Sequence, residues 1–316
     1  MPLTYDRRIR AGLEKALTPG GAAQSLAVRH VEDPGRVDLQ LRGYPGQARN
    51  WVTLYCGLTK PLDLTETNGR YRLGAHATWR HYGPNLPWNT PLDEGQLREI
   101  WPLVDTYLDE VLPVIKGSRW SLKEGDVQTA VSRLRHAGMV VFDREACPSF
   151  ADTAEKLQVM AEERDRLTAG LTGSEPWWSI PQLGEECDAL AIDANGRLLA
   201  IEVKPASAAA RSITFAPLQA AYYARLFQRW AAGADDPAAS LDEVISQCAR
   251  LGLAPAGGRG RTSLDRRAGR DHRRRVAQYG GAAPLPRGPR PFARCRDGPG
   301  AARLDARRGG RRDRSK

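Results

Sequence analysis

The sequence contains no run of 18 consecutive apolar residues, so a membrane-spanning helix is not expected. The first residues, MPLTYDRRIRAGLEKAL, carry early charges and lack the apolar segment of a secretory signal. The cysteines are scattered and show no C-x-x-C spacing, which argues against a disulfide framework or a zinc cluster. They are Cys56, Cys147, Cys187, Cys248 and Cys295. We therefore expect a cytoplasmic protein with reduced thiols and no membrane partner.

Several catalytic signatures are also missing. The chain has no P-loop and no G-x-S-x-G nucleophile elbow, and its five histidines show no H-E-x-x-H or comparable ligand spacing. A nucleotide-driven motor, an elbow-type serine hydrolase and a histidine-rich zinc enzyme are therefore not expected.

The net charge of +10 is concentrated at the C-terminus. From residue 251 onward there are 19 Lys and Arg against 5 Asp and Glu, which leaves 28 basic and 32 acidic residues in the first 250. The tail, residues 253–316, is rich in Arg, Gly, Ala and Pro, and we expect it to be disordered because it can bury little apolar surface. Two interpretations stay open: a basic arm that neutralises nucleic-acid phosphates, or an out-of-frame translation of GC-rich DNA.

Residues 1–120 predict an α+β domain. Helical spacing of apolar residues predicts a helix over 5–17, with Arg7, Arg8 and Arg10 on its solvated face. Alternating apolar and polar residues predict a small antiparallel sheet from strands at 37–43, 50–57 and 70–79. A helix over 93–117, kinked or divided around Pro102, should follow. This domain has no recognisable family; its alternatives are DNA recognition, contact with a partner protein or a second copy, or a simple extension of the fold.

Residues 121–252 predict a second domain of α/β type. The expected elements are a helix over 125–138 capped by Asp126, a strand at 139–142, an amphipathic helix over 151–170, a β-hairpin over 186–204, a helix from about Pro217, and a helix over 241–252. The Asn195-Gly196 pair is a strong hairpin-turn signal.

The hairpin, ECDALAIDANGRLLAIEVKP, places charges on strands that otherwise look buried. Because side chains alternate along a strand, Glu202 and Lys204 share a face, and pairing about the turn brings Asp188 roughly opposite residue 203. Two carboxylates that converge at a half-buried place repel each other, and a bound cation or a raised pKa relieves the repulsion. Mg²⁺ suits such oxygen ligands, and the lysine could orient a water or balance charge on a phosphate.

The Asp188 … Glu202-Val203-Lys204 set on a hairpin followed by a helix resembles the PD-(D/E)XK nuclease superfamily, over about residues 150–250. Gln219-Ala-Ala-Tyr222-Tyr223 resembles the Gln-x-x-x-Tyr element of its RecB-like branch. Cys187 stands where the superfamily name has proline. The resemblance implies a restriction-endonuclease-like core with a mixed central sheet flanked by helices. It also implies a fourth strand after the Gln/Tyr helix, which here would fall in or near the tail.

The resemblance further implies roles for particular residues. Asp188 and Glu202 would bind Mg²⁺ or Mn²⁺, and Lys204 would position the attacking water. Gln219 with Tyr222 or Tyr223 would support the site or contact the strand, and Glu186 could add a ligand. An acid on the preceding helix is also expected, with three candidates: Glu155, Glu162 and Glu163.

The sequence therefore predicts a metal-dependent nuclease that hydrolyses phosphodiester bonds, with DNA as the favoured substrate. The alternative is an inactive module of the same fold that binds nucleic acid or a partner protein. Both endo- and exonucleolytic cleavage fit this prediction.

Overall fold

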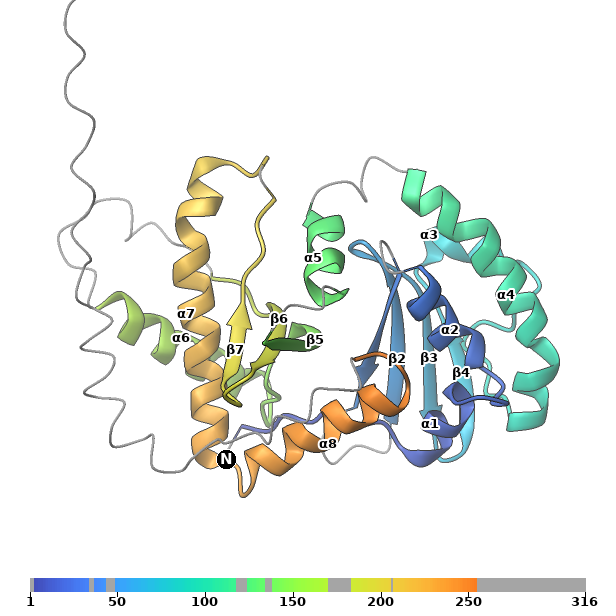
Figure 1. Ribbon diagram of the computed structural model, residues 1–316, viewed down its shortest axis with the longest axis horizontal. Coiled ribbons are helices and arrows are strands. Elements are labelled where there is room, and N and C mark those ends of the chain that lie inside the picture. The colour runs from blue at the N-terminus through green and yellow to red at the C-terminus, as the bar shows by residue number, and fades with distance from the viewer. Residues whose placement is uncertain are drawn as a thin grey trace, which may run out of the picture. The chain divides into compact units, whose positions relative to one another are not determined.

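The computed structural model describes residues 3–33, 37–43, 49–117, 124–133, 138–169, 183–205 and 207–254, and all of these lie in one compact unit, residues 1–265. The tail predicted to be disordered, residues 253–316, lies outside this description from residue 255 onward, whereas the amides of Leu253 and Ala254 bond the Cys248 carbonyl at 2.8 and 3.3 Å. The fold is a mixture of helices with two antiparallel sheets (Figure 1). The domain boundaries expected at residues 120 and 252 stay predictions.

The first sheet is a four-stranded antiparallel meander in the order β1-β2-β3-β4. Its strands are β1 Val37–Arg42, β2 Arg49–Cys56, β3 Thr59–Thr67 and β4 Arg70–Gly74. Positive φ angles of 50° at Asn68 and 74° at Gly69 form the turn between β3 and β4, because asparagine and glycine tolerate this backbone conformation. The predicted small antiparallel sheet is thus confirmed, with one further strand, β3, but the strand expected over 70–79 ends at Gly74, and residues 77–80 form a short helix instead.

Four helices belong to this first half: α1 Ala11–Leu17, α2 Gln24–Glu32, α3 Ala77–Arg80 and α4 Glu94–Gly117. The prediction of one helix over 5–17 is wrong in its first part, because the backbone of residues 5–10 is not helical. Tyr5 and Arg7 instead donate buried hydrogen bonds to Asp143 at 2.7 and 2.8 Å, so Arg7 does not lie on a solvated face. The division expected at Pro102 is also absent, since α4 runs through it.

The second sheet has three strands in the order β5-β6-β7: β5 Met139–Ala146, β6 Cys187–Asp193 and β7 Leu198–Ile201. Both pairings are antiparallel, so the mixed sheet expected from the resemblance is not observed in the described residues. The endonuclease-like core is accordingly not confirmed. No strand follows β7 within the part of the chain described up to residue 254.

The described residues of this half also form four helices: α5 Glu124–Arg133, α6 Thr153–Thr168, α7 Ala210–Gly233 and α8 Pro237–Arg250. Asp152 caps α6 by accepting a hydrogen bond from the Glu155 amide at 2.8 Å, which confirms the predicted amphipathic helix. Asp126 does not cap α5, because the helix begins two residues before it. Similarly, α7 begins at Ala210 and contains Pro217 inside it.

Helices cover both faces of the second sheet (Figure 1). On one side α7 contacts β6 and β7, and α6 packs on α7. On the other side α5 contacts β5 and β6 and also reaches β1 of the first sheet. Leu199 and Ile201 pack on that side with Ala189, Ala191 and Val131 of α5. Helix α5 therefore lies between the two sheets.

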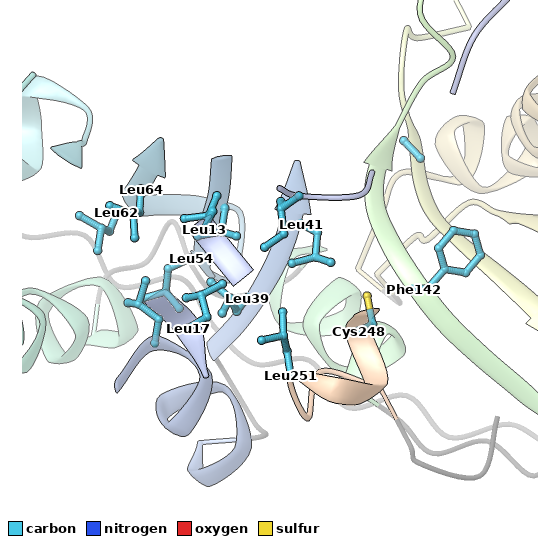
Figure 2. Packing of buried hydrophobic residues seen from close by; sticks show 14 of the residues in the cluster. Leu13, Leu17, Leu39, Leu41, Leu54, Leu62, Leu64, Phe142, Cys248 and Leu251 are labelled. Carbon is cyan, nitrogen blue, oxygen red and sulfur yellow. The ribbon is translucent and has the colours of Figure 1, made fainter. Parts of the chain in front are cut away.

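The apolar core continues from one sheet to the other. Figure 2 shows Cys248 and Leu251, at the end of α8, between the leucines of β1 and Phe142 of β5. The isolated bridge between Thr4 and Ser149 joins the same two halves at the N-terminus. Contacts of this kind fix the second sheet, and the hairpin within it, against the first.

Candidate functional site

The β6–β7 hairpin has the predicted turn. Ile192 pairs with Leu198 and Ala189 with Ile201, and Gly196 takes a φ of 75°. Asp193 accepts hydrogen bonds from the amides of Asn195 and Arg197, both at 2.9 Å, which closes the turn. A closed turn sets the register of the two strands, and the register decides which residues meet at the far end.

At that far end the three predicted residues converge. The Lys204 ammonium donates to Glu202 Oε1 at 2.6 Å. Asp188 Oδ2 accepts from the Val203 amide at 2.6 Å, so its carboxylate is held at the residue between Glu202 and Lys204. The Glu202 side chain is only 4% exposed and that of Lys204 16%. We call these three residues the hairpin cluster.

Burial governs the electrostatics of the hairpin cluster. It raises the pKa of Glu202 to about 7, and the nearby charge of Asp188 adds to this rise although Lys204 opposes it. Burial likewise raises the pKa of Asp188, while the Val203 amide and Lys204 act in the other direction. Burial lowers the pKa of Lys204, but its bond to Glu202 and the charges of Glu202, Asp188 and Glu124 together outweigh this and leave the pKa above its ordinary value. Lys204 is therefore a cation at neutral pH, whereas Glu202 is near its titration midpoint.

Two residues of α5 join the cluster and were not identified from the sequence. Glu124 Oε1 lies 3.6 Å from the Lys204 ammonium. Gln128 donates from its amide nitrogen to Asp188 Oδ1 at 2.8 Å. Their spacing of four residues on a helix that precedes the sheet was the available signal, because such residues share a helix face.

The acids proposed for that helix position lie elsewhere. Glu155 bonds the Ala151 amide in the first turn of α6. Glu162 pairs with Arg229, and Glu163 pairs with Arg166 and Arg225. Glu162 and Glu163 therefore neutralise arginines of α6 and α7, and the acid that lies beside the hairpin from a preceding helix is Glu124.

Glu186 is not brought into the hairpin cluster. It is exposed, and the charged groups that act on it most strongly are those of Glu145, Lys60 and Arg42, which belong to the first sheet and to β5. The prediction of a further ligand at Glu186 therefore finds no support in its position.

The Gln/Tyr element of α7 holds the chain that enters β6. Gln219 and Tyr223 both donate to the Leu183 carbonyl, at 3.2 and 2.8 Å. A Cβ atom on Gly184, where φ is 89°, would lie 2.4 Å from the Tyr223 hydroxyl, so only glycine fits this approach. Tyr222 points instead to the Met160 carbonyl of α6, at 3.4 Å. Of the two tyrosines left open by the sequence, Tyr223 is the one that supports the hairpin.

The donor chemistry suits Mg²⁺ better than zinc. Glu202 Oε2 is buried and accepts no hydrogen bond from the described residues, and Asp188 offers a second carboxylate beside it. The described residues contain no group of three or more His, Cys, Asp or Glu side chains suited to a metal ion. Mg²⁺ commonly takes only one or two carboxylates and keeps several waters, whereas structural zinc sites use four side chains. Cys147, Cys187 and Cys248 are free thiols.

Comparison with known proteins gives no further assignment: no protein-family model, curated protein or solved structure matches the chain. Within the described residues, no helix has the length and apolar character needed to cross a membrane.

Proposed function

We propose that the chain is a metal-dependent nuclease that hydrolyses phosphodiester bonds, with DNA as its substrate. One observation carries the proposal: two carboxylates and a lysine converge at the end of a hairpin, and one oxygen of Glu202 is buried without a hydrogen-bond donor among the described residues. An unsatisfied buried carboxylate oxygen is costly, and a cation relieves that cost.

In the proposed reaction Asp188 and Glu202 bind Mg²⁺ or Mn²⁺ in their ionised forms. A divalent ion held by these two carboxylates would supply an activated water and would polarise a phosphoryl oxygen. Lys204 remains protonated, so it acts as a hydrogen-bond donor that orients the water and balances charge on the phosphate, rather than as a base. Gln219 and Tyr223 act through the backbone by holding Leu183, where the chain turns into β6.

The choice of DNA rests on the resemblance of the Asp188 … Glu202-Val203-Lys204 set to the PD-(D/E)XK nucleases. The order hairpin then Gln/Tyr helix, β6–β7 followed by α7, agrees with that resemblance. We propose the restriction-endonuclease-like core on the basis of the same resemblance.

An inactive module that binds nucleic acid or a partner protein is the second candidate. The specific observation in its favour is that the described residues contain no metal-binding group of three side chains. Such a module need not bind Mg²⁺ near Asp188, so metal affinity separates the two candidates.

Plasmid and linear DNA cleavage with Mg²⁺ or Mn²⁺ tests the proposal. Lys204→Ala should lower the cleavage rate by about 10²–10³, the usual effect of removing one charge-stabilising group. Lys60→Ala is the matched control, because Lys60 also pairs with a glutamate, Glu145 at 2.5 Å, but lies outside the hairpin cluster. Equal cleavage rates of the wild type and Lys204→Ala would refute the proposed role of Lys204. A reduced rate for Lys204→Ala together with a wild-type rate for Lys60→Ala would support it.

A further inference from the structure

Helix α5 presents polar side chains to both sheets at once. Gln128 and Thr129 are buried, with 5% and 0% exposure, and Ser132 is partly buried. Figure 1 shows α5 between the second sheet and the strands of the first. Buried polar groups are stable only when they are hydrogen-bonded, so their partners reveal what the helix connects.

The partner shared by Gln128 and Thr129 is Arg144 of β5, whose side chain is completely buried. Its guanidinium donates to Asp38 of β1 at 3.1 Å and to the Gly57 carbonyl at 3.1 Å. It also donates to Thr129 at 3.3 Å and to Gln128 Oε1 at 3.0 Å. Burial alone would raise the pKa of Asp38, but Arg144, with smaller contributions from His30, Ser132 and Gln40, lowers the pKa below its ordinary value, so Asp38 stays ionised. Ser132 adds a hydrogen bond to the same carboxylate at 2.6 Å.

Gln128 links this ion pair to the hairpin cluster. Its oxygen accepts from Arg144, and its nitrogen donates to Asp188 Oδ1 at 2.8 Å. Arginine has only donors and a carboxylate only acceptors, so the chemistry of the two neighbours admits one orientation of the amide. With the Val203 amide on Oδ2, both oxygens of Asp188 are fixed in direction.

The position of α5 is itself tightly defined. A Cβ atom on Gly125 would lie 2.4 Å from the Leu58 amide nitrogen and 2.7 Å from the Gly57 carbonyl carbon. The first turn of α5 therefore touches the β2–β3 turn, backbone against backbone. Arg144 bonds the carbonyl of the same Gly57, so the two contacts reinforce each other.

We propose that Gln128 is a positioning residue for Asp188, and that the buried Asp38–Arg144 pair holds Gln128 in place. The first sheet then sets the direction of an acid in the hairpin cluster. A role of this positioning in catalysis rests on the proposed nuclease function. The orientation of Asp188 by Gln128 does not depend on that function.

Amide hydrogen exchange of Val203 in the metal-free, full-length protein tests the positioning. The Val203 amide is bonded to Asp188, so its exchange reports whether that carboxylate stays in place. Gln128→Met should accelerate Val203 exchange by about tenfold or more, relative to amides in the middle of β6, because a hydrogen bond to a charged group is lost. Gln128→Glu keeps the acceptor for Arg144 but cannot donate to Asp188, and it should give the same result if Gln128→Met does not fold.

Ser132→Ala is the matched control. It removes a hydrogen bond from the same helix to Asp38 but leaves Gln128 intact. Its thermal stability should fall while the exchange of Val203 relative to β6 stays at the wild-type value. Unchanged Val203 exchange in the folded Gln128 variants, or equal acceleration in Ser132→Ala, would overturn the proposal.

Mn²⁺ affinity of the same proteins separates this inference from the proposed function. Loss of a residue that orients a metal ligand typically weakens metal binding 10–100-fold, and we expect this for Gln128→Met. If the wild type binds no Mn²⁺ but Val203 exchange still accelerates in the variants, the positioning stands and the nuclease proposal fails.

Discussion

Glu202 is the residue with the most unusual environment in the hairpin cluster. Its side chain is 4% exposed, one oxygen bonds Lys204, and the other accepts no hydrogen bond from the described residues. Burial raises its pKa from 4.5 to about 7. If Glu202 binds a metal ion as proposed, a proton competes with that ion close to neutral pH, and metal affinity should increase as the pH rises through 7.

The raised pKa also predicts how stability depends on pH. The folded state holds a proton on Glu202 up to about pH 7, whereas the unfolded state releases it near 4.5, so the wild type loses stability as the pH rises between these values. Glu202→Gln removes the ionisation but keeps an acceptor for Lys204. Without metal, the variant should match the wild type near pH 4 and exceed it at pH 8 by about 1–3 kcal/mol. Urea unfolding at several pH values measures the difference.

The control for this prediction is Glu162→Gln. Arg229 lowers the pKa of Glu162, so this variant should lose rather than gain stability at high pH. A difference between Glu202→Gln and the wild type that does not change between pH 4 and pH 8 would contradict the raised pKa.

At the residue level, the sequence predicted the members of the hairpin cluster that lie close along the chain. Asp188, Glu202 and Lys204 share one hairpin, and strand alternation with the Asn195-Gly196 turn determines how they meet. Glu124 and Gln128 come from a helix about 60 residues earlier. Their convergence depends on tertiary packing of α5 against β6, which periodicity does not encode.

At the element level, α5 decides whether the cluster assembles. Gly125→Ala should push the helix away from the β2–β3 turn, because its Cβ would lie 2.4 Å from the Leu58 amide nitrogen. We expect a loss of about 1–3 kcal/mol in the free energy of unfolding, the usual cost of overpacking, together with weaker Mn²⁺ binding. Chemical denaturation and a metal titration measure the two effects.

Gly117→Ala serves as the comparison for Gly125→Ala. Gly117 ends α4, and a Cβ atom there meets nothing within 4 Å. Its stability and Mn²⁺ affinity should stay near the wild-type values. If Gly125→Ala is equally harmless, the close contact of α5 with the β2–β3 turn does not control the cluster.

The spacing of apolar residues predicted helices and strands best where those apolar residues form the face that packs against the core. The amphipathic α6 and the hairpin are such cases. The segment before α1 is not, since Tyr5 and Arg7 leave the helical path to reach the buried Asp143. Pro217 was expected to begin a helix because proline is favoured there, yet α7 extends upstream through residues 210–216.

At the scale of the whole molecule, buried contacts cross the domain boundary predicted at residue 120. Asp143 pairs with Arg7 and Arg42, at 2.8 and 3.0 Å, and Arg144 pairs with Asp38. Gln247 of α8 exchanges two hydrogen bonds with the backbone of Ile9, at 2.8 and 2.9 Å. Ion pairs buried to this degree are strongly destabilising when one partner is removed.

These contacts predict that the second half does not fold alone. A fragment of residues 121–254 would lack the partners of Asp143 and Arg144 and would expose the apolar side chains of α8 and β5 that pack against the first half. Both losses remove part of a stability that in a typical domain is only about 5–15 kcal/mol. We expect circular dichroism of an unfolded or partly folded chain and no cooperative thermal transition. The control is residues 1–254, which retains every contact described and should unfold cooperatively. A cooperative transition in the fragment would show that the boundary at 120 separates independent domains.

A divalent cation at Asp188 and Glu202 is the premise on which the nuclease proposal depends, and calorimetric titration with Mn²⁺ tests it most directly. The wild type should bind Mn²⁺, and Asp188→Asn should weaken that binding at least tenfold. Asp193→Asn is the matched control, because Asp193 lies on the same strand and also accepts backbone hydrogen bonds, but at the turn. Its affinity should equal that of the wild type. No binding to the wild type, or equal binding to Asp188→Asn, would contradict the proposed site.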